Sequence, residues 1–320
     1  MSDIIVAGAG GFIGGHLTGR LLGQGHRVLA VDIKPMNEWY QVHETADQLV
    51  ADLRSFDSCN NALSLMPGAR VYNLAADMGG MGFIAKHRVE CMQSALITIN
   101  LLRAAEMYGS KEFFYASSAC VYNDSLQQDT VVSLKEEDAW PADPEPGYGM
   151  EKLFGEEIAK FYREETDLKP VVARFHNIFG PFGTYKGGRE KAPAAICRKV
   201  AQARLLNYKD IEIWGDGEQT RSFLYVDECL EGIDRMMAAD IDVPLNLGSS
   251  ELVSINTLVS MVEDIAGIKL NRQYVLDAPQ GVRGRNSDNT LIQEKLNWKP
   301  SESLYDGLEK TYAWISDQLI

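Results

Sequence analysis

The sequence lacks the features that mark membrane, secreted and metal-binding proteins. It contains no apolar run of membrane-spanning length, and its first residues show no basic segment followed by a long apolar one, so neither a spanning helix nor a membrane partner is predicted. Its five cysteines form no CxxC pair, and its five histidines form no HxxxH or HExxH pair. We therefore expect a reduced, cytoplasmic chain without a metal site. With 31 Lys and Arg against 45 Asp and Glu, the net charge is -14, which argues against nucleic acid as a main partner.

What the sequence does contain is an alternation of short apolar runs and helical patterns. Its 320 residues, 45% hydrophobic and 24% charged, suffice for one large domain or two interleaved ones. Strands are predicted at 4–7, 27–31, 48–51, 70–74, 112–117 and 171–174, and helices at 12–24, 57–64, 89–108 and 148–165. This alternation predicts an α/β fold, a Rossmann-type doubly wound parallel sheet covered on both faces. Asn60 and Asn61 make the crossover at 57–64 less certain.

The pattern changes after Arg174. Residues 177–193 hold six glycines and prolines, which indicates a functional loop. Later helices are predicted at 193–203, 227–238, 256–266 and 302–318, with one added strand at 243–247. Because the second half shows no complete sheet of its own, we expect a smaller, interleaved lobe. The predicted division is 1–175 plus about 223–247 for the dinucleotide-binding domain, and about 176–222 plus 248–320 for the substrate lobe.

A glycine-rich turn follows the first predicted strand and opens a helix. It comprises Gly8, Gly11, Phe12, Ile13 and Gly14. Its glycines allow a tight turn, close approach of a pyrophosphate and close helix–strand packing, while the helix N-terminus offers N–H donors to the phosphates. Asp32 ends the second strand, where a carboxylate accepts hydrogen bonds from both ribose hydroxyls, so NAD is favoured over NADP. Lys34, nearby, is the one residue that argues against this preference for NAD. The alternative interpretation of these residues is a glycine turn beside a solvated aspartate, without a cofactor.

Two further strand ends are candidate cofactor contacts. Asp52 and Leu53 close the third strand and are placed to meet the adenine. Ala75 follows the fourth strand, where small residues let the cofactor lie over the backbone. Ligands collect at the carboxyl ends of such strands, although plain strand-end packing is the alternative for both positions.

Tyr148 and Lys152 stand four residues apart, so both lie on one face of a predicted helix. A lysine beside a phenol, near a cationic nicotinamide, lowers the pKa of the phenol, and tyrosinate then accepts a hydroxyl proton during hydride transfer. Tyr-x-x-x-Lys alone is common and usually structural. Its weight here comes from the predicted NAD site and from Ser118 at the end of the fifth strand.

With these residues, the chain resembles the extended short-chain dehydrogenase/reductase family of nucleotide-sugar epimerases and dehydratases. The resemblance assigns Ser118, Tyr148 and Lys152 to the redox triad of that family. Two residues after the serine, 4-epimerases often carry threonine and 4,6-dehydratases a glutamate base, whereas this chain has Cys120. A thiol, with a reference pKa of about 8.5, exchanges protons near neutrality in an electropositive site. The alternative is a small, buried, apolar cysteine.

The loop before the helix at 193–203 is rich in cations. Lys186, Arg189 and Lys191 fall within six residues of an acidic protein, and Gly187 and Gly188 allow the backbone to pass close to a ligand. This arrangement indicates a binding loop, with a solvated charged loop as the alternative.

Within this family, the chain most resembles the members that invert two carbons of a GDP-hexose. It rests on the stretches 75–83, 117–120, 174–177, 187–193, 214–223 and 281–289. One departure is Asn123-Asp124, where the family usually has Pro-Glu. The resemblance implies contacts to the hexose, the diphosphate and the nucleoside from Asp77, Met78, Gly79, Gly80, Met81, Asn177, Glu190, Lys191, Ala192, Lys199, Gln219, Arg221 and Arg285. Each charged residue of this set could instead form an interdomain ion pair, Lys199 above all.

The resemblance also implies a mechanism and an assembly. Tyr148 would act as base in a transient oxidation at C4, and the ketone would acidify C3 and C5 for proton exchange by Cys120 and Lys191. The ammonium of a lysine, with a reference pKa of about 10.4, suits donation unless Arg189 and desolvation lower it. The family forms homodimers through the helices at 89–108 and 148–165. Compatible apolar positions are Ala95, Ile99, Leu102 and Met107, which could also simply face the sheet.

Two other readings remain open at this stage. The first is another enzyme of the same fold, such as a 4-epimerase or a 4,6-dehydratase. The second is a non-catalytic NAD-binding sensor, which would have no need to keep the serine, tyrosine and lysine together.

Overall fold

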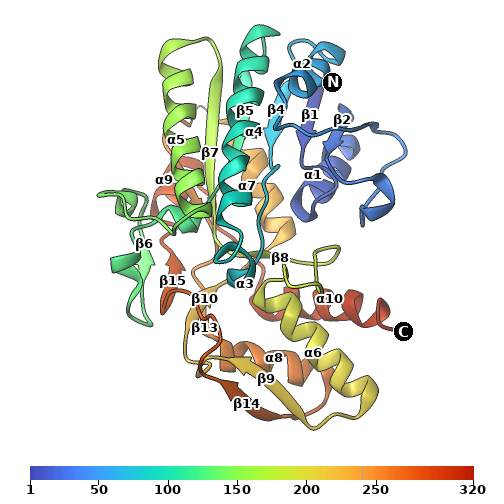
Figure 1. Ribbon diagram of the computed structural model, residues 1–320, viewed down its shortest axis with the longest axis vertical. Coiled ribbons are helices and arrows are strands. Elements are labelled where there is room, and N and C mark those ends of the chain that lie inside the picture. Colours follow the sequence, from blue (N-terminus) through green and yellow to red (C-terminus); the bar gives the residue numbers. More distant parts are fainter. Residues whose placement is uncertain (240) are drawn as a thin grey trace.

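A parallel sheet of seven strands forms the upper part of the computed structural model, which describes residues 1–239 and 241–320 (Figure 1). Its strands are β1 (Asp3–Ala7), β2 (Arg27–Asp32), β3 (Asp47–Val50), β4 (Arg70–Asn73), β5 (Glu112–Ser118), β7 (Lys169–Phe175) and β12 (Leu245–Leu247). Their order is β12-β7-β5-β4-β1-β2-β3, and every pair is parallel. The order reverses at β1, which is the arrangement of doubly wound dinucleotide-binding folds. The predicted fold class is confirmed.

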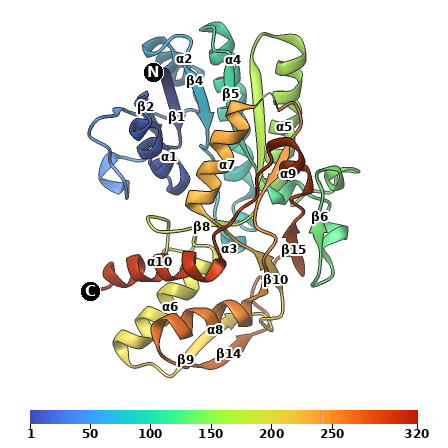
Figure 2. The same ribbon diagram turned by 180° about the vertical axis from the view of Figure 1, so that it is seen from behind.

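Helices cover both faces of this sheet. One face carries α2 (Phe56–Leu65), α4 (Arg88–Met107) and α5 (Tyr148–Glu165), and the other carries α1 (Phe12–Gly23) and α7 (Val226–Ala238) (Figures 1 and 2). Each face has its own apolar core, and the core under α1 and α7 continues into the lower lobe. The helix predicted at 57–64 forms despite its two asparagines, and the Asn60 side chain accepts a hydrogen bond from the Tyr108 hydroxyl at 3.1 Å.

The lower lobe contains more sheet than the sequence suggested. Its helices are α6 (Ala192–Leu206), α8 (Ile255–Ala266) and α10 (Leu304–Asp317). A four-stranded sheet has the order β13-β10-β15-β6, formed by Leu252–Ser254, Thr220–Ser222, Gly284–Ser287 and Ser133–Leu134. A second pair joins β9 (Asp210–Trp214) to β14 (Asn271–Val275). The second half therefore has strand pairing that the sequence did not indicate, although its four-stranded sheet is completed by β6 from the first half of the chain.

These strands escaped prediction because they are short and polar. Strand β15 reads Gly-Arg-Asn-Ser, which has neither apolar alternation nor β-branched residues. It is buried along its whole length because β10 and β6 flank it on both edges. Partners that are distant in the sequence, rather than local propensity, make this segment a strand.

The remaining elements are small. They are α3 (Met81–Ile84), α9 (Thr290–Leu296), β8 (Ile178–Phe179) and β11 (Leu224–Tyr225), with single 3₁₀ turns at Met36–Glu38, Ala119–Val121, Asp124–Gln127 and Glu136–Ala139. Helix α10 begins at Leu304, two residues later than predicted, because the Ser303 side chain accepts the N–H of Asp306 and caps the helix.

The two-domain division stays a prediction. Strand β12 at 245–247 joins the edge of the large sheet, whereas β6 at 133–134 comes from the first half of the chain and pairs with β15 in the lower lobe. Within residues 1–239 and 241–320, no helix is long and apolar enough to cross a membrane. The same residues contain no cluster of three or more His, Cys, Asp or Glu side chains placed to hold a metal ion.

Candidate active site

The glycine turn between β1 and α1 has the geometry that a pyrophosphate needs. Gly8 has a φ of +86°, and a Cβ atom at Gly14 would lie 2.1 Å from the Gly8 carbonyl oxygen, so the predicted close helix–strand packing is present. Gly11 stands at the N-cap of α1 and forms no side-chain cap. The N–H groups of the first turn therefore face a position where a phosphate can replace the missing cap.

Asp32 is fixed beside this turn at the end of β2. Its side chain is only 7% exposed, and its two oxygens accept the N–H groups of Gly10 at 2.9 Å and Lys34 at 3.0 Å. The ammonium of Lys34 donates to the Gly10 carbonyl at 3.3 Å. The carboxylate is thus oriented by the backbone, and the dissenting lysine is engaged with the turn itself. These residues fit a dinucleotide with free ribose hydroxyls.

The residues predicted to contact the cofactor at the other two strand ends already contact other parts of the protein. Asp52 pairs with Arg54 at 2.7 Å, and hydrogen bonds from that arginine lower the pKa of the Asp52 carboxyl. Leu53 is buried, and its carbonyl accepts the thiol of Cys59. Ala75 lies against Gly8, with its backbone nitrogen 2.8 Å from where a Cβ atom at Gly8 would stand. Their contacts with a cofactor stay predictions.

The structure brings Ser118, Tyr148 and Lys152 together as predicted. Tyr148 is the first residue of α5, Lys152 follows one turn later, and Ser118 ends β5 beside them. The Lys152 ammonium lies 5.6 Å from the centroid of the Tyr148 ring and 3.6 Å from a carboxylate oxygen of Glu151. All three side chains of the triad are buried.

The pKa of Tyr148 moves opposite to the sequence-based expectation. Burial raises the pKa of this phenol well above its usual value, and the neighbouring Cys120 and Glu151 raise it further, while a hydrogen bond with Ser118 lowers it. The protein groups alone therefore do not produce the expected depression. The expectation also relied on a cationic nicotinamide, whose charge is external to the chain.

Cys120 sits in the 3₁₀ turn that follows β5. The Ser118 hydroxyl accepts the N–H of Cys120 at 3.2 Å and fixes the start of this turn. A Cβ atom at Gly149 would lie 2.1 Å from the Cys120 carbonyl oxygen, so only glycine lets α5 approach here. The side chain is 9% exposed, and the Arg285 guanidinium donates to its sulfur at 3.3 Å.

Lys191 reaches the same place from the lower lobe. It is the N-cap residue of α6, and its side chain is half-buried. Burial lowers the pKa of Lys191, Cys120 raises it, and Arg285 lowers it. The expectation named Arg189 as the lowering neighbour. Arg189 instead forms an ion pair with Asp77 at 2.6 Å, and its guanidinium lies 3.8 Å from the centroid of the Phe83 ring. Burial therefore lowers the pKa of Lys191 as expected, but the neighbouring cation that lowers it is Arg285 and not Arg189.

The predicted hexose loop and the glycine-hinged loop lie against one another. The N–H of Gly80 donates to the Arg189 carbonyl at 3.1 Å, and a Cβ atom at Gly80 would lie 2.7 Å from the Glu190 carbonyl oxygen. This contact brings the segment Asp77, Met78, Gly79, Gly80 and Met81 next to Glu190, Lys191 and Ala192.

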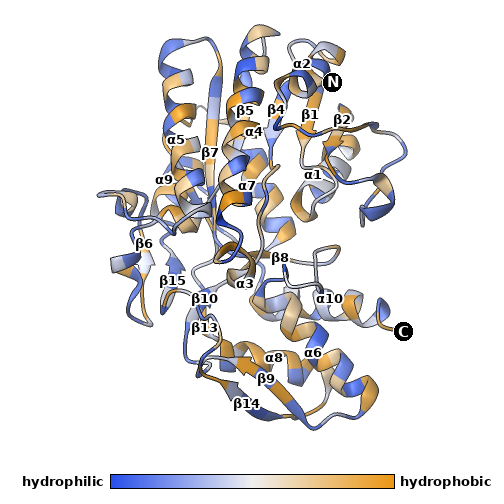
Figure 3. Ribbon diagram, viewed as in Figure 1, coloured by the Kyte–Doolittle hydropathy of each residue, from blue (hydrophilic) through white to orange (hydrophobic). Residues whose placement is uncertain are grey.

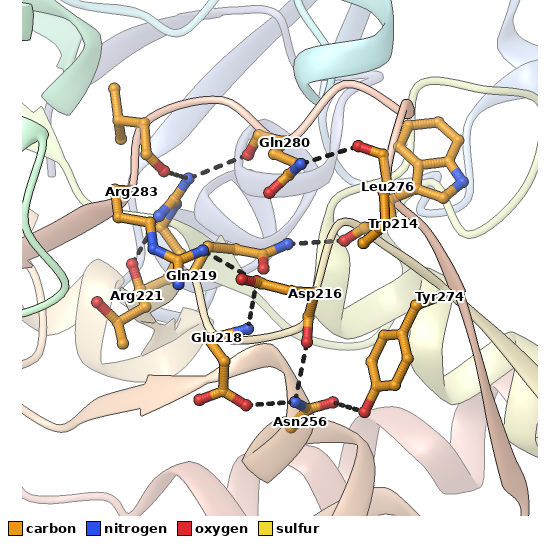
Figure 4. Close-up of polar contacts among 12 residues, drawn as sticks. Trp214, Asp216, Glu218, Gln219, Arg221, Asn256, Tyr274, Leu276, Gln280 and Arg283 are labelled. Atoms are coloured by element: carbon orange, nitrogen blue, oxygen red, sulfur yellow. Dashed lines mark hydrogen bonds and ion pairs between the residues drawn. The ribbon is translucent and has the colours of Figure 1, made fainter.

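A group of polar side chains surrounds the strand β10 in the lower lobe (Figure 4). Arg221 donates to the carbonyls of Thr220 at 2.6 Å, Gln280 at 3.3 Å and Val282 at 2.6 Å. Burial, followed by the charge of Arg285, lowers the pKa of Arg221 to about 9. Among the residues that the structure describes, no carboxylate forms an ion pair with either arginine. The two cations therefore keep an uncompensated positive charge next to Cys120.

Gln219 belongs to the same group and has unused hydrogen-bonding capacity. Its amide nitrogen donates to the Trp214 carbonyl at 2.8 Å (Figure 4). Its amide oxygen is buried and, within the described part of the chain, has no hydrogen-bond partner. A buried acceptor of this kind is normally satisfied, so a ligand donor is expected here.

Three predicted substrate residues already have partners in the protein. Lys199 donates to the Glu212 carbonyl at 2.8 Å and forms an ion pair with the Glu212 carboxylate at 3.5 Å, within the lower lobe rather than between domains. Glu190 pairs with Arg198 at 3.3 Å. Asn177 donates to the Ser222 carbonyl at 3.0 Å. Substrate contacts by these three side chains stay predictions.

Sequence reasoning missed Gln127, a fully buried residue that contacts Arg285. The two residues are 158 positions apart, and no motif or spacing marks the glutamine. It also missed Glu151, which is buried beside Lys152 and whose pKa burial raises. The position of Glu151 inside the Tyr-x-x-x-Lys stretch was the available signal, because a carboxylate on that buried helix face needs a partner.

Comparisons with known proteins agree with this geometry. Residues 4–248 match the NAD dependent epimerase/dehydratase family. GDP-mannose 3,5-epimerase 1 of Oryza sativa subsp. indica is 49% identical over 322 residues, covering 99% of this chain and 82% of that protein. The fold matches UDP-glucose 4-epimerase with UDP-glucose from Thermotoga maritima, with a TM-score of 0.89 at 24% identity over 99% of this chain and 100% of that one. UDP-glucuronic acid 4-epimerase from Bacillus cereus, in complex with UDP-glucuronic acid and NAD, gives a TM-score of 0.82 at 26% identity over the same shares.

Proposed function

The chain belongs to the NAD dependent epimerase/dehydratase family, and we propose that it epimerises a GDP-hexose at C3 and C5. The proposed substrate is GDP-mannose, and the products are GDP-L-galactose and also GDP-L-gulose. The 49% identity to a plant GDP-mannose 3,5-epimerase supports this assignment. The observation that carries it is that Cys120, whose sulfur accepts a hydrogen bond from the Arg285 guanidinium, and Lys191 come from different parts of the chain and lie near enough for their charges to interact.

The proposed NAD site consists of the glycine turn and the ends of three neighbouring strands. Its residues are Gly8, Gly11, Phe12, Ile13, Gly14, Asp32, Asp52, Leu53 and Ala75, together with Tyr148 and Lys152. When bound, NAD supplies a hydride acceptor for C4 and a hydride donor for its later reduction. The uncapped start of α1 holds the phosphates, and Asp32 holds the adenosine ribose.

Tyr148 handles the proton of the C4 hydroxyl. It accepts that proton as C4 is oxidised and returns it when C4 is reduced, while Ser118 and Lys152 hold the phenol in place. The intervening ketone makes the hydrogens at C3 and C5 acidic. Inversion of each carbon requires removal of a proton from one face and delivery of another to the opposite face. Cys120 and Lys191 form the pair that removes and delivers these protons.

The nucleotide part of the substrate lies along the group around β10. Arg221 and Arg285, which pair with no carboxylate in residues 1–239 and 241–320, offer two cations to the diphosphate, where a planar guanidinium is geometrically suited. Gln219 offers its unsatisfied amide oxygen to the nucleoside. Asp77, Met78, Gly79, Gly80 and Met81 line the hexose side, with Asn177, Glu190, Ala192 and Lys199 as further contacts.

The test is incubation of the purified protein with GDP-mannose in deuterated water, followed by NMR of the sugar. Deuterium is expected at C3 and C5. Cys120→Ala and Lys191→Ala are expected to lose ~10²–10⁴ in the rate of deuterium entry, as a positioned acid or base contributes about that much. The matched control is Cys91→Ala, which removes another buried thiol from the apolar cluster that contains Cys120 and Tyr148.

Three outcomes would contradict the proposal. Inversion at C4 without deuterium at C3 and C5 would favour a 4-epimerase, the activity of the proteins whose structures resemble this one. Loss of water from the sugar would favour a dehydratase. Absence of any turnover, with NAD bound, would favour a sensor.

We also infer a homodimer through α4 and α5. Hydrophobic and hydrophilic residues alternate along both helices in Figure 3. These helices present exposed apolar side chains at Val89, Met92, Leu96, Met150, Phe154 and Phe161. A face of this kind supports association between protein chains. Of the positions named from the sequence, Leu102 is fully buried, Ala95 and Ile99 are half-buried, and Met107 is exposed.

Light scattering tests this assembly. The unmutated protein is expected to have the mass of a dimer at micromolar concentration, and Leu96→Asp is expected to have the mass of a monomer. Leu205→Asp, at an exposed apolar position on α6, is the control and should stay dimeric. A monomeric mass for the unmutated protein would refute the inference.

A further inference from the structure

The guanidinium of Arg285 is held between a thiol and an amide. Its Nη1 donates to the Cys120 sulfur at 3.3 Å, and its Nε donates to the amide oxygen of Gln127 at 2.5 Å. Gln127 ends the 3₁₀ turn Asp124–Gln127, so the segment that follows β5 supplies both the thiol and the residue that holds the arginine. Arg285 itself comes from β15 in the other sheet.

The orientation of the Gln127 amide is fixed. Its side chain is completely buried, and its nitrogen donates to the carbonyls of Tyr122 at 3.3 Å and Asn123 at 3.2 Å. With both N–H groups committed to carbonyl oxygens, the amide oxygen must face the guanidinium. The direction of Arg285 is therefore set by a residue that is not itself among the predicted triad or substrate contacts.

The amide fixes the guanidinium without neutralising it. In the described part of the chain, no carboxylate lies within ion-pair distance of Arg285. The charged and titratable groups that interact with Arg285 or Cys120 are Lys191 and Arg221 from the lower lobe, Tyr148 from α5, His176 after β7 and Glu145 from the loop before α5. Glu145 accepts the N–H of Gly149 at 3.0 Å. Burial raises the pKa of its carboxyl and the charge of Arg285 acts to lower it, without an ion pair between the two among the described residues.

We propose that Gln127 is a positioning residue for Cys120: it aims Arg285 at the sulfur and, as a neutral acceptor, does not neutralise the guanidinium that faces the thiol. The proposal rests on the proposed function, in which Cys120 exchanges protons with the sugar. It predicts that an uncharged side chain of similar length without an acceptor, as in Gln127→Met, releases the guanidinium. It also predicts that Gln127→Glu captures the guanidinium in an ion pair and weakens its effect on the thiol.

The first experiment measures the thiol without requiring turnover. The NAD-bound protein is treated with iodoacetamide at one fixed pH near neutrality, and mass spectrometry follows alkylation of the Cys120 peptide. Gln127→Glu is expected to slow this reaction ~10-fold, because an opposite charge within a few ångströms has effects of that size. Gln128→Glu is the matched control, since it adds the same charge at the adjacent, exposed position and should react like the unmutated protein.

A double-mutant comparison separates positioning from a general structural effect. In an Arg285→Gln background, Gln127→Glu is expected to cause no further slowing, because it acts through the arginine. Equal slowing in both backgrounds would overturn the proposal, as would equal reactivity of Gln127→Glu and Gln128→Glu. Thermal unfolding and NAD content verify the fold. If Gln127→Glu fails to fold, Gln127→Met carries the same test with the same expected slowing.

The second experiment uses GDP-mannose in deuterated water. Gln127→Glu is expected to reduce kcat for deuterium entry at C3 and C5 by ~10-fold or more, while hydride transfer at C4, followed by NADH absorbance, stays normal. Slowing at C4 as well would point to a structural defect and count against the proposal. If the unmutated protein incorporates no deuterium at all, the proposed function fails, and the alkylation comparison still decides the role of Gln127.

Discussion

Three arginines that are buried or half-buried in this chain are balanced in two different ways. In the large sheet, Arg174 forms a bidentate pair with Glu156, with 2.7 Å between the nearest atoms, and both side chains are 3% exposed. Next to Cys120, Arg221 and Arg285 donate to backbone carbonyls, an amide and a thiol, and within the described residues neither meets a carboxylate. The first set is neutral as a unit, whereas the second keeps its positive charge.

The difference in charge balance between these arginines indicates where an anion is expected to bind. A buried cation without a counter-ion is costly, and it persists where a ligand supplies the missing charge. The pair of Arg174 and Glu156 is complete without any ligand, and the Ser117 hydroxyl adds a further hydrogen bond to the carboxylate. The pair therefore serves the fold, and the uncompensated set serves the site.

The largest effect on folding is expected from opening the closed pair. Arg174→Ala leaves the Glu156 carboxylate buried and unpaired, which should reduce the free energy of unfolding by about 3–5 kcal/mol. Urea denaturation measures this loss. The control Arg235→Ala breaks an exposed i,i+4 pair with Glu231 and should cost about 0.3–0.5 kcal/mol. Equal losses in the two variants would remove the distinction between the sets.

Removing Arg221 or Arg285 should weaken ligand binding and leave the stability of the fold unchanged or higher. Arg221→Met deletes a charge that its surroundings disfavour, so the melting temperature should stay the same or rise. Binding of GDP should weaken by ~10–100-fold, because a hydrogen bond to a charged group contributes about 1.5–3 kcal/mol. Calorimetry and thermal unfolding measure the two quantities. A variant that unfolds easily yet binds GDP normally would reverse the assignment.

Asp32 is the corresponding case of a buried anion whose charge is left for a ligand. It is a buried carboxylate that accepts two backbone N–H groups, and among the described residues it forms no ion pair. Asp32→Ala should weaken NAD by ~10-fold or more and reduce the preference for NAD over NADP, because two charge-assisted hydrogen bonds to the ribose are lost. Titration of the apoprotein with both cofactors measures this. Equal affinity of the unmutated protein for NAD and NADP would sink the assignment.

The smallest expected effect is a pH dependence of the free energy of unfolding, which comes from His176 beside Arg174 and Arg285. Burial lowers the pKa of His176 to about 3, and the charges of Arg285 and Arg174 contribute. Because this pKa is below the ordinary value of about 6.5, the unfolded chain binds the proton more tightly than the folded chain does. The stability gained by keeping His176 neutral is present above about pH 6.5 and is lost as the pH falls toward 3.

Denaturation at several pH values measures this contribution. The loss should not exceed about 1.4 kcal/mol per pH unit. His176→Gln should show a shallower decline in stability below pH 6.5, whereas His87→Gln, on an exposed histidine, should decline like the unmutated protein. Parallel curves for all three proteins would contradict the buried, neutral histidine.

The sequence by itself determined the large sheet and the local chemistry of the cofactor turn. Short runs of four to six residues between helical patterns indicated all seven strands of the large sheet, including β12, with ends shifted by two residues or fewer, and the predicted start and end of α5 are those observed. The glycine spacing and Asp32 could be interpreted because strand, turn and helix are adjacent in the chain, where local propensity and periodicity act. The triad was accessible for the same reason, since Tyr148 and Lys152 share one helix.

Only the tertiary structure decided the environment of Cys120. Arg285 lies 165 positions from this cysteine, and Gln127 lies 158 positions from Arg285, so no local pattern links them. The polar strand β15 has no strand propensity and is held by neighbours on both edges. Which cations keep their charge depends on the partners that folding brings near: Glu156 for Arg174, and a neutral amide for Arg285. Charge balance in a buried site is a property of packed neighbours, and the sequence specifies these neighbours only through the complete fold.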